Sequence, residues 1–144
     1  MTNLGAEARY RLDHVEVPLR LSGPGDVDAL IDSLLEGPDD QNLAQLHSLD
    51  RTLLPSGDFD HELLVGADRA LGVGALAFMD EGNWTTLGPE GGRTEVNYFI
   101  MGHLTEFPER SDISIDLLRR AVKEFVLSGG KRPTCVDWQV PEYW

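Results

Sequence analysis

Cysteine is nearly absent from this sequence of 144 residues, in which Cys135 is the only one. A single thiol cannot close a disulfide within the chain, so nothing indicates an oxidising compartment. Apolar runs are short as well, and none approaches the roughly 18 residues that a membrane span needs. The first residues lack the basic and then apolar layout of a signal peptide. We therefore expect a soluble, cytoplasmic protein that makes no membrane contact.

Basic residues are also scarce. Twelve lysines and arginines stand against 25 aspartates and glutamates, which gives a formal net charge of −13. Nucleic acid and anionic lipid repel such a chain, so direct binding to either is not expected. Excess acid commonly serves only to keep a protein in solution. The more specific hypothesis is that the chain binds a basic protein partner, for example one that itself binds nucleic acid.

Motifs for metal binding and catalysis are incomplete throughout the chain. His14 and Glu16 match the HxE half of the zinc deaminase signature, but the PCxxC half requires a second cysteine that the sequence lacks. Cys135 with His103 is an alternative nucleophile and base, yet the apolar strand expected around Cys135 favours a buried, inert thiol. We expect no catalytic residue, no cofactor and no metal, and predict that the chain is not an enzyme.

Hydrophobic periodicity predicts two helices. Apolar residues recur at helical spacing over residues 26–36. Asp26 is the expected N-cap of this helix, and Gly37, in the left-handed conformation, is the expected stop. The same spacing covers residues 114–128, which a pair of glycines follows.

Short extended runs occupy most of the remaining chain. Residues 9–21 predict an early strand pair with a bulge or turn at Asp13 and His14. A last strand is expected over residues 134–138, whereas residues 39–58 fit either a short helix or a covered loop. Turn signals separate four further runs that predict an antiparallel meander, at residues 61–68, 71–80, 83–88 and 95–101.

The order of these elements predicts an α+β fold. We expect one domain over residues 1–144, built from an antiparallel sheet of about five to six strands and two main helices. No internal repeat or low-complexity linker divides the chain.

Carboxylates gather on the solvent face of the first predicted helix. Asp26, Asp28, Asp32 and Glu36 share this face with no basic residue between them, and residues 39–40 add two more aspartates. Like charges four residues apart cost a few tenths of a kcal/mol per pair. A solvated face is the favoured interpretation, and steering of a cationic partner is the alternative.

Acidic and aromatic residues adjoin one another in two predicted turns. Asp80, Glu81 and Trp84 lie at one hairpin turn, and Glu106 and Phe107 lie in the loop expected between a strand and the second helix. Aromatic side chains beside carboxylates in loops are typical interface anchors, so these five residues are the predicted partner-binding set. Trp84 fits a core position equally well, because large aromatics in strands are usually buried.

Two longer stretches resemble a known family. They are VGADRALGVGALAFMDEGNW and NYFIMGHLTEFPERSDISIDLLRRAVKEFVLSGGKRPTCVDWQ, within a similarity that covers roughly residues 43–139. The MGHxTEFP block and the GGxRPTCVxW ending carry most of it. The chain resembles the first-numbered immunity family of bacterial polymorphic toxin systems, although Leu104 replaces the aromatic residue that usually follows MGH.

The resemblance implies an antitoxin that acts in the cytoplasm by direct occlusion of a secreted toxin. The toxin's active domain would often be a cytidine deaminase acting on DNA or RNA, whose cationic groove an acidic surface fits. Two alternatives remain open, namely an inhibitor of a nuclease or other cationic toxin, and an enzyme that depends on Cys135.

Overall fold

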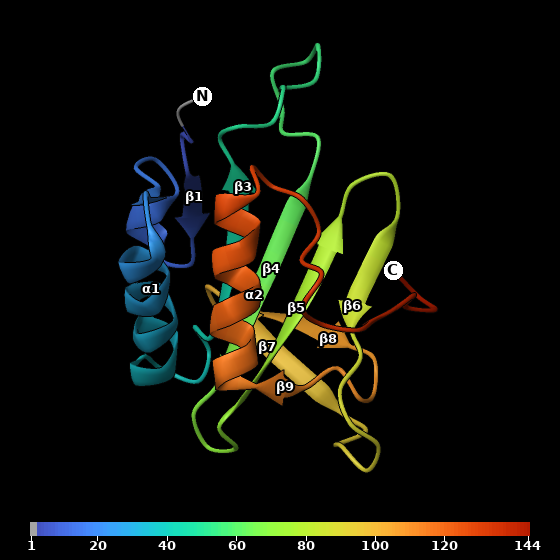
Figure 1. Ribbon diagram of the computed structural model, residues 1–144. Helices are drawn as coiled ribbons and strands as arrows, with labels where there is room; N and C mark the ends of the chain where they lie inside the picture. The colour runs from blue at the N-terminus through green and yellow to red at the C-terminus, as the bar shows by residue number, and fades with distance from the viewer. Residues whose placement is uncertain (1–2) are drawn as a thin grey trace.

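A computed structural model describes residues 3–144 of the chain (Figure 1). Two helices cover one face of a large antiparallel sheet, and a hairpin of two strands crosses behind it. The helices are α1 (Pro24–Glu36) and α2 (Ile115–Leu127), and a 3-10 helix spans Leu12–His14. The strands are β1 (Ala6–Arg9), β2 (Leu19–Leu21), β3 (Leu43–Ser48), β4 (Glu62–Asp68), β5 (Val73–Met79), β6 (Asn83–Thr86), β7 (Val96–Ile100), β8 (His103–Phe107), β9 (Ile113–Ser114) and β10 (Trp138–Gln139).

The large sheet has the spatial order β2-β1-β3-β4-β5-β6-β10, with the short β9 beside β5, and all of its pairs are antiparallel. β7 and β8 form the second, two-stranded sheet. The predicted α+β class with two main helices is confirmed, and the number of strands is higher than predicted. Neither α1 nor α2, the helices of residues 3–144, has the length and apolar character that crossing a membrane requires.

Several strand predictions change in the structure. The early strand pair is β1 and β2, joined by the 3-10 helix where a bulge or turn was expected. The open stretch 39–58 contains β3, an inner strand between β1 and β4. β4, β5 and β6 form the predicted meander, but β7 leaves it to pair with β8. The strand predicted over residues 134–138 is wrong, since only Trp138–Gln139 pairs, with β6.

The ends of α1 also differ from the prediction. Gly23 is the N-cap and Pro24 the first helical residue, so the assignment of Asp26 as N-cap is wrong. The carboxylate of Asp26 instead reaches back from the first turn and accepts a hydrogen bond of 2.7 Å from the Ser22 amide. Gly37 ends the helix in an extended conformation and not in the left-handed one. For α2, the Ser114 hydroxyl accepts from the Leu117 amide at 3.2 Å, as a serine N-cap does.

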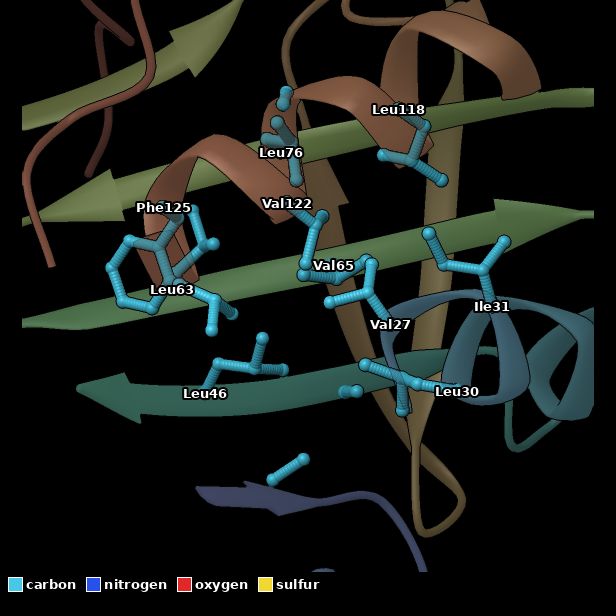
Figure 2. Close-up of a cluster of buried hydrophobic side chains, with 14 of the residues drawn as sticks. Val27, Leu30, Ile31, Leu46, Leu63, Val65, Leu76, Leu118, Val122 and Phe125 are labelled. Atoms are coloured by element: carbon cyan, nitrogen blue, oxygen red, sulfur yellow. The ribbon is translucent and has the colours of Figure 1, made fainter. Parts of the chain in front are cut away.

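The main core lies between the helices and the large sheet (Figure 2). Alternate residues of the inner strands point to this side, because side chains alternate along a strand. They meet the apolar stripes of both helices, and each such side chain that becomes fully buried is worth about 2 kcal/mol. The cluster includes Val27, Leu30, Ile31, Leu46, Leu63, Val65, Leu76, Leu118, Val122 and Phe125.

A smaller core fixes the β7–β8 hairpin to the opposite face of the sheet. Tyr98 is fully buried there, beside Phe107 and the backbone of Gly66. The Tyr98 hydroxyl donates to Asp112 at 2.8 Å, and Arg93 donates to Asp112 and to Asp68 at the end of β4. This ion-paired network ties the hairpin to the large sheet and to the segment before α2.

Candidate partner-binding surfaces

The first predicted set lies at the β5–β6 hairpin, as expected. Phe78 and Trp84 face each other across the two strands, and exposed Asp80 and Glu81 form the turn. These four residues line a hollow of about 260 Å³ together with Arg132. The guanidinium carbon of Arg132 lies 4.3 Å from the centre of the Trp84 ring. We call this space at the β5–β6 turn the hairpin hollow. It already holds a cation from the same chain.

Trp84 lies between the core position and the surface position that the sequence left open. Its ring is partly buried and packs against the main core, with its centre 6.5 Å from that of Phe78. Arg132 covers the ring from outside, in a cation–π arrangement. The carboxylate of Asp80 lies 3.9 Å from Arg51, so part of the acidity at this turn is also compensated within the chain.

The second predicted set lies in strand β8, and its placement in a loop is wrong. Glu106 is exposed, whereas Phe107 is 5% exposed and packs edge-to-face on Tyr98, with ring centres 5.4 Å apart. No glycine or proline lies within residues 103–107, so the sequence contained no turn signal against a strand there. The structure does not bring this set into the hairpin hollow, since Glu106 and Phe107 line a separate one.

The hollow beside β8 is formed with residues that sequence reasoning missed. Segment 141–144 runs along the end of β8, and the Trp144 indole donates a hydrogen bond of 3.1 Å to the Glu106 carbonyl. The acidic and aromatic residues of the PEYW segment were the signal in the sequence that could have pointed to this surface. We call this space the β8 hollow, and it is lined by Glu106, Phe107, Pro108, Glu109, Pro141, Glu142, Tyr143 and Trp144.

Leu104 occupies the outer surface of the β7–β8 hairpin. It pairs with Phe99 across the hairpin and is 50% exposed, two residues from Glu106 on the same face. The side chain at this position therefore makes little contact with the core. An aromatic residue at this position would likewise lie on the outer surface of the hairpin and outside the small core.

Two cations of α2 pair with part of the acidic face of α1. Arg119 pairs with Asp28 at 3.1 Å and with Asp32, and Lys123 pairs with Asp28 at 2.9 Å. The hydrogen bond from Lys123, with those from Arg119, lowers the pKa of Asp28. The solvated face therefore includes two cations from α2 that the sequence analysis did not place there. Asp26, Glu36 and the aspartates at 39–40 form no ion pair with a lysine or arginine of residues 3–144, so this part of the surface stays acidic.

The candidate catalytic residues do not assemble. Cys135 lies in a loop beside a hollow that also contains Arg110, and burial raises the pKa of its thiol. His103 is exposed at the start of β8 and does not line that hollow. His14 lies in the 3-10 helix and not in a strand, with Nδ1 accepting from the amides of Tyr10 and Arg11. Within residues 3–144 there is no group of three or more potential ligands for a metal ion.

Two buried histidines lie where β3 and β4 pair. His61 accepts a hydrogen bond of 2.7 Å from the Ser48 amide at Nε2, so its proton is on Nδ1, 2.9 Å from Asp60. Burial is the largest influence and lowers the pKa of His61. His47 stacks on Phe59 with ring centres 4.2 Å apart, and burial lowers its pKa to about 4. Both rings are therefore neutral at pH 7.

Comparison with known families decides the identity. The family model of the immunity protein Imm1 matches residues 16–140. The chain belongs to the Imm1 family. A search of curated proteins found no match. Membership of the Imm1 family indicates an immunity protein with a cognate toxin as its partner.

The fold gives the GGxRPTCVxW block of this Imm1 protein a structural role. Arg132 of the block covers Trp84, and its guanidinium carbon lies 6.0 Å from the Trp138 ring centre. The Trp138 indole donates to the Pro133 carbonyl at 2.8 Å. The block therefore fastens the segment after α2 against the β5–β6 hairpin and leads the chain toward the β8 hollow.

Proposed function

We propose that this Imm1 protein neutralises a toxin that deaminates bases of DNA or RNA, by binding over its active site or substrate groove. The family match supports a toxin as partner, and the net charge of −13 supports a cationic surface on it. A nucleic-acid deaminase has such a surface, because its groove must hold phosphates. The charge of the immunity protein is the single observation that favours a toxin with a cationic, nucleic-acid-binding groove.

Inhibition on this proposal is steric and electrostatic and uses no catalytic group of the chain. Carboxylates occupy positions that phosphates would take, and the bound protein excludes the nucleic acid. The complex forms in the cytoplasm, where the toxin meets its substrate. The same charge keeps the immunity protein itself off nucleic acid.

The test uses the toxin encoded beside the gene. Co-expression should restore growth of cells that make the toxin, and the two purified proteins should elute together on gel filtration. In vitro, deamination of a single-stranded oligonucleotide should fall as the immunity protein is added, and excess oligonucleotide should compete. Failure of rescue together with absence of a complex refutes the proposal.

The second candidate is inhibition of a nuclease or another cationic toxin, which the same charge favours. Product analysis separates the two candidates. Conversion of cytosine to uracil in intact strands identifies a deaminase, and strand cleavage identifies a nuclease. Competition by oligonucleotide without any effect of salt on affinity would contradict the electrostatic mechanism for both.

A further inference from the structure

The β8 hollow combines carboxylates with aromatic rings in a space of about 360 Å³. Glu106, Glu109 and Glu142 are all exposed at its rim. No lysine or arginine of residues 3–144 lines the hollow, and within that part of the chain none of the three glutamates forms an ion pair. The local charge is therefore strongly negative and is not compensated by the protein itself.

One side of its aromatic wall is packed within the protein, and the other side is exposed. Phe107 is held between Tyr98 and Trp144, with ring centres 5.4 Å and 5.3 Å away. Trp144 is fixed in turn by its hydrogen bond to the Glu106 carbonyl. Tyr143 is 90% exposed, so its ring gains almost nothing from packing within the chain. An exposed tyrosine beside an anchored aromatic wall is typical of a binding surface.

The hairpin hollow shows which group such an arrangement takes. There, Arg132 lies on Trp84 beside Asp80 and Glu81, so aromatic face and carboxylates together hold a guanidinium. The β8 hollow offers the same two kinds of group and lacks the cation. A guanidinium suits it better than an ammonium, because it stacks flat on a ring and donates to a carboxylate from two nitrogens.

We propose that the β8 hollow is the docking site for an arginine side chain of the toxin. The inference rests on the proposed function. It assigns the contact with the toxin to the β8 hollow and not to the hairpin hollow or to the acidic end of α1. Arginine is common on surfaces that hold phosphates, so the residue that the toxin uses on nucleic acid is available to this site. Leu104 lies on the same outer face of the β7–β8 hairpin as Glu106.

Two sets of variants test the site against the toxin domain in a direct binding titration. The first set is Tyr143→Ala and the triple variant Glu106→Gln, Glu109→Gln and Glu142→Gln. The control triple variant, Glu36→Gln, Asp39→Asn and Asp40→Asn, removes the same charge from exposed positions at the end of α1. All of the altered side chains are exposed, and circular dichroism melts check that each variant is folded.

Both hollow variants should raise Kd about ten-fold or more, as the loss of an anchor contact does. The control should change Kd by less than about three-fold, since charges outside the contact act mainly on the association rate. Equal effects of the two triple variants would mean that only net charge matters and would overturn the inference, as would unchanged binding by both hollow variants. Failure of the unaltered protein to bind would instead refute the proposed function.

A photo-crosslinking residue at position 143 gives a second readout. Under the inference, it captures a toxin peptide that contains an arginine, and changing that arginine to alanine weakens binding by a similar factor. In the double variant, Tyr143→Ala should then add little further loss, because the two changes remove one contact. Capture of a peptide without arginine, or additive losses, would overturn the assignment.

Discussion

Replacing Gly66 with alanine tests how the β7–β8 hairpin is seated on the sheet. A methyl group at Gly66 would lie 2.7 Å, 2.8 Å and 2.9 Å from Cδ1, Cγ and Cε1 of Tyr98. Carbon atoms in contact prefer about 3.5–4.0 Å, so the ring or the strand must move. The ring is fully buried, and its hydroxyl is held by Asp112, so it has no free direction.

The expected loss of unfolding free energy is about 1–3 kcal/mol, as for other overpacked cores. It should be measured by urea denaturation followed by circular dichroism. Gly25→Ala is the matched control, because a methyl group there meets nothing within 4 Å. The control should be neutral or slightly stabilising.

The background variant Tyr98→Ala makes the test specific. Without the ring, the added methyl group has room, and alanine in a strand is favoured over glycine by roughly 0.5–1 kcal/mol. Gly66→Ala should therefore change sign and become stabilising in that background. A loss of the same size in both backgrounds, or no loss in the unaltered protein, would refute the packing argument.

Three further predictions concern other parts of the molecule. Folding lowers the pKa of His47 from 6.5 to about 4, so between these two pH values the unfolded chain binds more protons than the folded one. The contribution of His47 to the free energy of unfolding should therefore be full above pH 6.5 and fall as the pH drops toward 4. An NMR titration with a midpoint for His47 near 6.5, or an unchanged pH dependence in His47→Asn, would contradict this. Ser114→Ala removes the N-cap of α2 and should cost about 1 kcal/mol in urea denaturation, whereas equal stability would show that the hydrogen bond to Leu117 contributes nothing. Cys135→Ala should rescue toxin-producing cells as well as the unaltered protein does, and lost rescue with retained folding would support a Cys-dependent enzyme.

Local patterns were sufficient where an element's partner is close in the sequence or its periodicity is strong. The α2 stripe and the β4–β5–β6 meander are of this kind, since spacing alone identifies the buried face and short turns impose antiparallel pairing. β3 was not assigned because it lies between β1 and β4 and is buried on both faces for most of its length. Such a strand loses the alternation that marks a half-exposed one.

The candidate site divides in the same way. The net negative charge and the neighbouring acidic and aromatic residues at 80–84 and 106–107 can be read from the sequence. They identified residues that line two hollows. The hairpin hollow has its own cation because Arg132 contacts Trp84, which lies 48 positions earlier in the chain. No local spacing in the sequence predicts this contact.

The sequence by itself determined the fold class, the excess of negative charge and the resemblance to an immunity family, because composition, periodicity and short motifs are local properties. Tertiary structure alone decided which charges remain free. Arg119 and Lys123 compensate the α1 face across the helix pair, and Arg132 fills the hairpin hollow, whereas the glutamates around Tyr143 have no such partner among residues 3–144. Free charge is a property of which side chains meet in space, and it follows from packing.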